Sequence, residues 1–139
     1  MSEQGLRVDA TRGSPAVSRN YAFALVGAII WPFVIVAYFI ARRRRHLSDG
    51  IEQTHYAFQY RTTAVALIAF AVFSLITIAM FFWTPPQTTF VQFQMRFYLL
   101  GNAQWLVMLW FVVRCIRGLY LAASGRAIQN PKTLWVWAR

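Results

Sequence analysis

The side chains best suited to chemistry gather in one stretch, SDGIEQTHYAFQYRT, at residues 48–62. It holds one of the chain's two histidines and two of its four acidic residues. A carboxylate beside an imidazole is a common pair for general acid–base catalysis, and both groups also bind metals. Glu52 and His55 would be that pair in an enzyme acting on lipid at a membrane surface. The stretch is therefore a reactive site, a contact surface for a partner, or the polar start of a membrane helix.

The rest of the chain lacks the residues that a reaction would need. Zinc sites use three or four protein ligands, but His46 and His55 are the only histidines, and Cys115 lies a full apolar run away. The sequence has neither a G-x-S-x-G nucleophile elbow nor a G-x-x-x-x-G-K or G-x-G-x-x-G phosphate loop. We therefore predict no catalytic residue, no metal and no cofactor, and a protein that is not an enzyme.

The spacing of the polar residues in this stretch predicts a helix. Asp49 and Glu52 have the spacing of a capping box, and no helix breaker follows Gly50 until Pro85. Such a helix would be about 50 Å long, against a hydrocarbon core of about 30 Å. At about 100° per residue, five polar side chains fall on one stripe: Glu52, His55, Gln59, Thr62 and Thr63. We expect this stripe to face headgroups, water or a partner.

The composition is that of a membrane protein. Of the 139 residues, 58% are hydrophobic and 13% are charged, whereas soluble domains carry about 25% charged residues. We predict an all-α integral membrane protein with three transmembrane helices, the second extended into the cytoplasm. The expected segments are a disordered tail at 1–20, spans at about 21–41, 62–83 and 96–116, a cytoplasmic linker at 42–61, and an interfacial segment at 117–139.

The distribution of positive charge predicts the orientation. The net charge of +10 comes from arginines that flank the apolar runs, which argues against nucleic acid as a partner. The linker between the second and third spans has no charge until Arg96. The positive-inside rule then places the first linker and the C-terminus in the cytoplasm and the N-terminus outside, although Arg7, Arg12 and Arg19 run counter to that last assignment. Six arginines are assigned to topology and to anionic lipid headgroups: Arg42, Arg43, Arg44, Arg45, Arg114 and Arg117.

A few residues inside the apolar runs predict local structure. Pro32 is expected to kink the first span and to favour packing of that face on another helix. Asn102 and Gln104 are polar side chains within the third span, and such groups usually bond to a neighbouring helix. Gly125 is expected to cap the third helix, and Asn130–Pro131 to form a turn. The predicted interfacial aromatic anchors are Tyr56, Tyr60, Trp135 and Trp137.

Two motifs carry a resemblance to a known family. HYAFQYRT at 55–62 and RCIRGLYLAASGRAIQNPKT at 114–133 resemble a family of small bacterial inner-membrane proteins, which is distantly similar to the membrane component of the chloroplast inner-envelope protein-import channel. The chain departs from the family pattern at Tyr60 and at residues 127–129. The resemblance covers about residues 21–133, and it implies a three-span fold in the bacterial inner membrane. The matching positions are His55, Gln59, Arg61, Thr62, Arg114, Arg117, Gly118, Gly125, Asn130, Pro131 and Thr133.

The function expected from the sequence is that of an accessory, assembly or stabilising subunit of a larger inner-membrane complex. Its partners would be other integral membrane subunits and anionic lipids, with a homo-oligomer left open. Two alternatives remain: an oligomeric channel or translocation component, and the lipid-modifying enzyme that would use Glu52 and His55. The residues expected to contact a partner are Glu52, His55, Gln59, Arg61, Asn102, Gln104 and Asn130.

Overall fold

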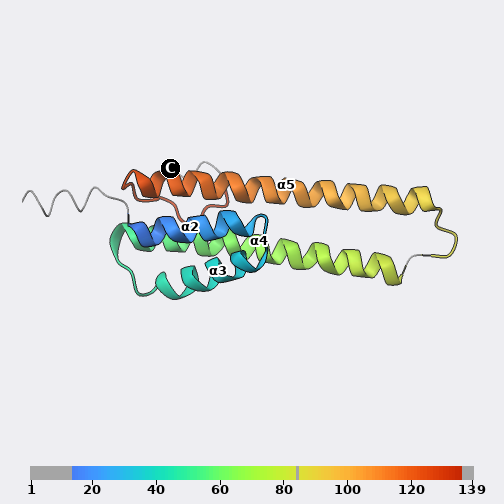
Figure 1. The fold of residues 1–139 in the computed structure, drawn as a ribbon, viewed down its shortest axis with the longest axis horizontal. Coiled ribbons are helices and arrows are strands. Elements are labelled where there is room, and N and C mark those ends of the chain that lie inside the picture. The colour runs from blue at the N-terminus through green and yellow to red at the C-terminus, as the bar shows by residue number, and fades with distance from the viewer. Residues whose placement is uncertain (1–13, 84, 136–139) are drawn as a thin grey trace, which may run out of the picture.

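The chain folds as two helical hairpins of different length. The computed structural model describes residues 14–83 and 85–135, which form four helices and no strand. The helices are α2 (Pro15–Gly27), α3 (Pro32–Arg44), α4 (Gly50–Phe82) and α5 (Phe90–Ala123). α2 packs against the other three helices, whereas α3 packs against α2 and α4 only. The short α2–α3 hairpin covers about half the length of the long α4–α5 hairpin (Figure 1).

The first apolar run does not form a single helix, so the predicted span at 21–41 is wrong. The chain reverses at residues 28–31, and α3 begins at Pro32, which has no N–H to continue the preceding helix. Gly27 allows the two helices to approach closely, because a Cβ atom there would lie 2.5 Å from the Val34 nitrogen. Each helix of 13 residues is about 20 Å long, too short to cross a hydrocarbon core of about 30 Å.

α4 and α5 are the two described helices that are long and apolar enough to cross a membrane. They have 33 and 34 residues, and α4 begins at Gly50 as predicted. Only 6% of the most apolar window of α4 and 28% of that of α5 are buried. The core helix of a soluble protein would be mostly buried, so these exposed apolar surfaces favour a membrane location. The structure thus contains two candidate spans where the sequence predicted three.

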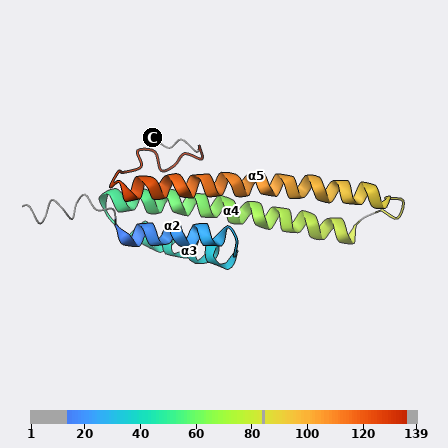
Figure 2. The ribbon, with the colours of Figure 1, turned by 45° about the horizontal axis from the view of Figure 1, so that its top comes forward.

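The two ends of the bundle differ in packing. We call the end that holds Pro15, Arg44, Gly50 and Ala123 the proximal end, and the end at residues 83–89 the distal end (Figures 1 and 2). The hydrophobic core lies in the proximal half, where α2 and α3 cover α4 and α5. From Leu67 to Trp110, no described residue is fully buried. In the distal half, α4 and α5 therefore pack against each other without a third helix from the described chain.

The segment before Tyr21 differs from the prediction, whereas two predicted features of the segment after α5 are present. Residues 15–20, expected within a disordered tail, are helical and begin α2, while residues 1–13 of that tail lie outside the described chain. After α5, the segment from Ser124 to Trp135 runs back along the bundle (Figure 2). Gly125 takes a φ of 64°, which confirms its predicted role after the end of α5. The Thr133 N–H donates to the Asn130 carbonyl at 3.3 Å, so the predicted turn is also present.

Candidate functional site

Four of the five residues of the polar stripe of α4 lie inside the protein, and the fifth, Glu52, is half-buried. His55, Gln59, Thr62 and Thr63 are 1–2% exposed, Asn20 on α2 is 2% exposed, and Arg114 on α5 is 0% exposed. The helical periodicity therefore placed the four buried residues of α4 on one face correctly, but that face packs against the rest of the protein. We call Asn20, Tyr21, His55, Gln59, Thr62 and Arg114 the buried polar network.

His55 uses both ring nitrogens in contacts within the chain. Nε2 lies 2.9 Å from the Arg126 carbonyl oxygen, which can only accept a hydrogen bond, so Nε2 carries the proton. Nδ1 is then the acceptor of the Tyr21 hydroxyl, at 3.3 Å. His55 precedes the apolar part of α4, and burial lowers its pKa, against a smaller opposing effect of the Arg126 carbonyl. In this arrangement the neutral imidazole has no nitrogen available for a substrate or a metal.

Two amide side chains join α2, α3 and α4. Asn20 Nδ2 donates to Gln59 Oε1 at 2.6 Å and to the Ala37 carbonyl at 3.3 Å. Gln59 Nε2 donates in turn to the Val17 carbonyl at 3.2 Å. These bonds satisfy polar groups on three helices, and buried polar groups are stabilising only when they are paired in this way. The two amides therefore help to fix the position of the α2–α3 hairpin.

Arg114 holds the C-terminal segment against the bundle. Its Nε donates to Thr62 Oγ1 at 2.9 Å, and its two terminal nitrogens donate to the carbonyls of Trp135 and Thr133, each at 2.7 Å. The guanidinium carbon also lies 4.0 Å from the centroid of the Phe58 ring. The prediction that Arg114 contacts lipid headgroups is wrong, because acceptors from α4 and from the C-terminal segment enclose it.

Three further bonds fix the C-terminal segment. Arg61 donates to the Lys132 carbonyl at 2.7 Å, Trp110 Nε1 to the Leu134 carbonyl at 3.1 Å, and the Ile128 N–H to Thr54 Oγ1 at 3.2 Å. The family-like motifs around residues 55–62 and 114–133 thus meet in space. Their polar side chains mainly bond to each other and to this segment, which is a structural role.

The predicted partner-contact residues fall into two groups. His55 and Gln59 are buried, so a partner cannot reach them on a free surface. Arg61 and Asn130 are exposed and Glu52 is half-buried, all in the proximal half of the bundle. Asn102 is exposed and donates to the Tyr98 carbonyl of its own helix at 2.7 Å. Gln104 is half-buried and borders a small apolar cleft near the tip of the α2–α3 hairpin.

The predicted anchors and the predicted cap are corrected in part. Tyr56 is 0% exposed, so it is not an interfacial anchor. Tyr60 is half-buried and stacks on Tyr38, with Arg45 on its ring, while Trp135 is 74% exposed. Trp137 lies outside the described residues. Asp49 makes no capping hydrogen bond, and the capping box that does form is on α5, between Thr89 and Gln92.

Glu52 and His55 do not line a common cavity. Glu52 borders an open cavity at the proximal end, and His55 is not among the residues that line it. Among the described residues, no three histidine, cysteine or acidic side chains are grouped so that they could hold a metal ion. The arrangement therefore gives the enzyme hypothesis no geometric support.

Sequence reasoning missed the contribution of α2. Asn20 and Tyr21 were assigned to the tail and to the start of a span, yet both belong to the buried polar network. Tyr21 packs against Gly118 of α5 so closely that a Cβ atom on this glycine would overlap the tyrosine ring. An asparagine and a tyrosine next to each other at the edge of an apolar run were the available signal. Their side-chain partners on α4, however, lie 39 and 34 residues away.

Comparison of the chain with protein-family models, with curated proteins and with solved structures finds no significant match. The resemblance to the small inner-membrane family therefore rests on the quoted motifs alone, and it stays a prediction.

Proposed function

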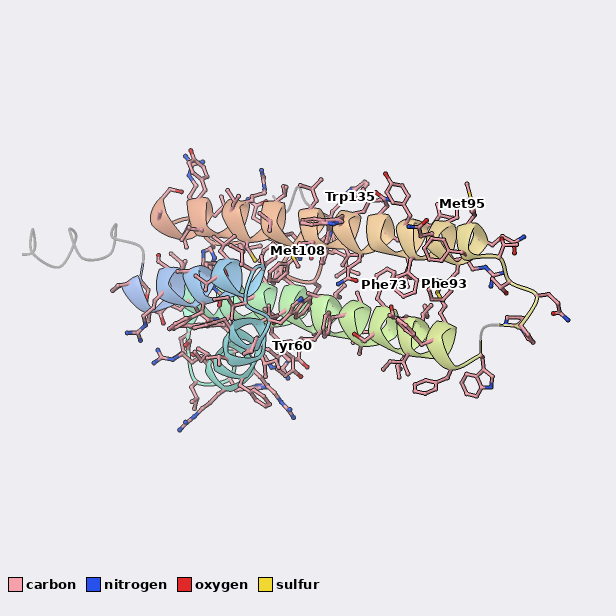
Figure 3. The ribbon with its side chains drawn as sticks, turned by 45° about the vertical axis from the view of Figure 1, so that its right-hand side comes forward. Tyr60, Phe73, Phe93, Met95, Met108 and Trp135 are labelled. Carbon is pink, nitrogen blue, oxygen red and sulfur yellow. The ribbon has the colours of Figure 1, made fainter. Side chains whose placement is uncertain are left out.

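We propose that this chain is a non-enzymatic membrane subunit that binds a transmembrane helix of another integral membrane protein. The partner helix would pack on the surface beside a small apolar cleft near the tip of the α2–α3 hairpin. We call this the tip cleft; it is lined by Trp31, Val34, Phe70, Phe73, Gln104 and Met108, among others. Phe73 and Met108 lie between α4 and α5 in Figure 3.

The orientation in the membrane follows from the charges at the proximal end. Arg42 to Arg45 and Arg126 lie there and Arg61 lies in the proximal half of α4, whereas Arg96 is near the start of α5 at the distal end. The positive-inside rule then favours a cytoplasmic proximal end. Because α2 and α3 form a hairpin, Pro15 lies at this same end, and Arg19 no longer conflicts with the rule. We therefore propose a cytoplasmic start for α2, in place of the periplasmic N-terminus expected from three spans.

The α2–α3 hairpin would enter only one leaflet. The Trp31 ring at its tip lies 3.9 Å from the Phe70 ring, centroid to centroid. Phe70 is about 13 Å along α4 from Arg61, at 1.5 Å per residue. The tip would therefore reach roughly the middle of a hydrocarbon core of about 30 Å. In the other leaflet α4 and α5 have no companion helix within the described chain, which leaves room for one from a partner.

The observation that carries the proposal is the Gln104 amide. Gln104 lies about 12 Å along α5 from Arg96 and about 15 Å from Arg114, near the middle of the membrane. It makes no hydrogen bond with the described residues, whereas the nearby Asn102 is satisfied by its own helix. Lipid acyl chains cannot form a hydrogen bond with an amide. A polar side chain on a neighbouring helix can, and this hydrogen bond stabilises the association of the helices by about 0.6–2 kcal/mol.

The test is purification of tagged protein in mild detergent or nanodiscs, followed by mass spectrometry. We expect a stoichiometric membrane-protein partner with wild type and with Asn102→Leu, and a severalfold lower recovery with Gln104→Leu. Asn102→Leu is the matched control, because it removes an amide at a similar depth that already has a partner. If Gln104→Leu recovers the partner as well as wild type does, the partner does not bind beside the tip cleft. Recovery of only the free chain or a homo-oligomer would contradict the proposed partner.

A further inference from the structure

A second cavity lies at the proximal end, between α2, the end of α3 and the start of α4. Three exposed arginines border it: Arg19 from α2, and Arg43 and Arg44 from α3. The guanidinium group is planar, always charged and matched to the geometry of phosphate oxygens. We call this the proximal cavity. Arg42, although part of the same run of arginines, does not line it.

Two buried polar atoms at this cavity have no partner among the described residues. Asn20 and Tyr56 both line the cavity and are 2% and 0% exposed, respectively. Asn20 Oδ1 and the Tyr56 hydroxyl make no hydrogen bond with the described residues. Buried polar atoms are nearly always paired, so a pair of unsatisfied atoms at one cavity points to a ligand that would satisfy them.

The Tyr56 hydroxyl is suited to donate to an anion. Tyr56 precedes the apolar part of α4, and burial raises its pKa, with the charge of Arg44 as the largest opposing effect. The hydroxyl therefore keeps its proton at neutral pH. Arg44, which also borders the cavity, is near enough for its charge to influence this pKa. A phosphate oxygen in the cavity that these two residues line could accept from both the guanidinium and the hydroxyl.

Asp49 and Glu52 also border the cavity. Their carboxylates favour a phosphate-containing ligand that also carries a positive charge or a hydrogen-bond donor. Within the described residues they form no ion pair with the three arginines. Two carboxylates oppose a free inorganic anion. A phospholipid can instead place its phosphate among the arginines and turn the ammonium or hydroxyl of its head group toward the carboxylates. Phe23 and Ile40 at the same cavity would contact its acyl chains.

We propose that the proximal cavity binds the phosphodiester head group of a membrane phospholipid. Arg19, Arg43 and Arg44 contact the phosphate, and the Tyr56 hydroxyl donates to one of its oxygens. Asn20 Oδ1 accepts from the ammonium or hydroxyl of the head group. This inference rests on the membrane location proposed above, but it is independent of the partner at the tip cleft.

The test measures thermal unfolding of purified protein in a phosphate-free detergent. Short-chain phosphatidylglycerol, phosphatidylethanolamine or inorganic phosphate is added over a range of concentrations. We expect at least one of the lipids to raise the melting temperature of wild type, and inorganic phosphate at equal concentration to have little effect. Arg44→Gln and Tyr56→Phe should each weaken the apparent lipid affinity about tenfold. Arg42→Gln, the matched control with the same loss of charge, should retain wild-type affinity.

Tyr56→Phe separates binding from folding. Its hydroxyl makes no bond within the described chain, so the variant without lipid should melt at the wild-type temperature or above. A wild-type lipid response in both Tyr56→Phe and Arg44→Gln would overturn the proposal. An equal loss in Arg42→Gln would show general attraction to positive charge and would also overturn it. An equal shift with inorganic phosphate would identify a simple anion site and refute the lipid.

Discussion

Replacement of Arg114 should release the C-terminal segment from the bundle. The guanidinium donates to Thr62 and to the carbonyls of Thr133 and Trp135, and it stacks on Phe58. Arg114→Ala removes all of these contacts. Arg114→Lys keeps the charge but not the planar fork, so it should lose most of the carbonyl bonds and fall between alanine and wild type.

The size of the effect follows from these bonds. A hydrogen bond to a charged group contributes about 1.5–3 kcal/mol. Water can replace part of this contribution at the two carbonyls, which are near the protein surface. Arg61 and Trp110 also retain their own bonds to the segment. We therefore expect Arg114→Ala to weaken attachment of the segment by about 3 kcal/mol, which raises its detached population on the order of 100-fold.

Limited trypsin digestion measures this population, because Arg126 and Lys132 are cleavage sites within the segment. Cleavage at these sites should accelerate on the order of 100-fold in Arg114→Ala, if opening is fast relative to cleavage. Arg96→Ala is the matched control, since Arg96 is exposed near the distal end. Cleavage rates within twofold of wild type in Arg114→Ala would refute the role assigned to this arginine.

Two further predictions concern the same core. Burial lowers the pKa of His55 below its ordinary 6.5, so the unfolded state binds more protons just below pH 6.5. The stabilising contribution of this residue is therefore complete above pH 6.5 and is lost as pH falls through the folded pKa. Melting temperatures from pH 8 to 5 should drop more steeply for wild type than for His55→Gln, and parallel curves would contradict this. Gly118→Ala should lower stability by about 1–3 kcal/mol, because its Cβ would overlap the Tyr21 ring. Gly101→Ala should not, since a Cβ there meets nothing within 4 Å, and equal melting temperatures for the two would refute the contact.

The long helices could be predicted because local rules determine them. α4 begins at Gly50 and continues through an apolar stretch without a breaker until the prolines near its end. The end of α5 likewise follows from Gly125, which adopts the positive φ that glycine permits. These features depend on residues that are close in sequence, so they can be predicted from the sequence alone.

The α2–α3 hairpin could not be predicted in this way. An apolar run of 21 residues has the length of one span, and a proline within it is compatible with either a kink or a break. The break here is stabilised by contacts that the sequence does not show, such as Gly27 against Val34 and Trp31 against Phe70. The number of spans therefore depends on tertiary packing.

The candidate site was likewise predictable only in its local features, and its long-range contacts were not. A helical wheel identified the face that carries His55 and Gln59, but not that α2 and the C-terminal segment cover it. Arg114 was assigned to headgroups because it follows an apolar run. Its acceptors, Thr62, Thr133 and Trp135, are 52, 19 and 21 residues away in sequence. A local sequence pattern does not reveal hydrogen bonds between residues that are this far apart in sequence.

Single-cysteine labelling tests most directly whether the chain crosses the membrane twice with a hairpin on one side. Cys115 is the only cysteine and is buried, so it can be replaced by alanine and single cysteines introduced at Ser14, Ser48, Gln87 or Ser124. A membrane-impermeant maleimide should label positions 14, 48 and 124 from one side of a sealed vesicle and position 87 from the other. Labelling of position 14 from the same side as position 87 would restore a third span and contradict the account.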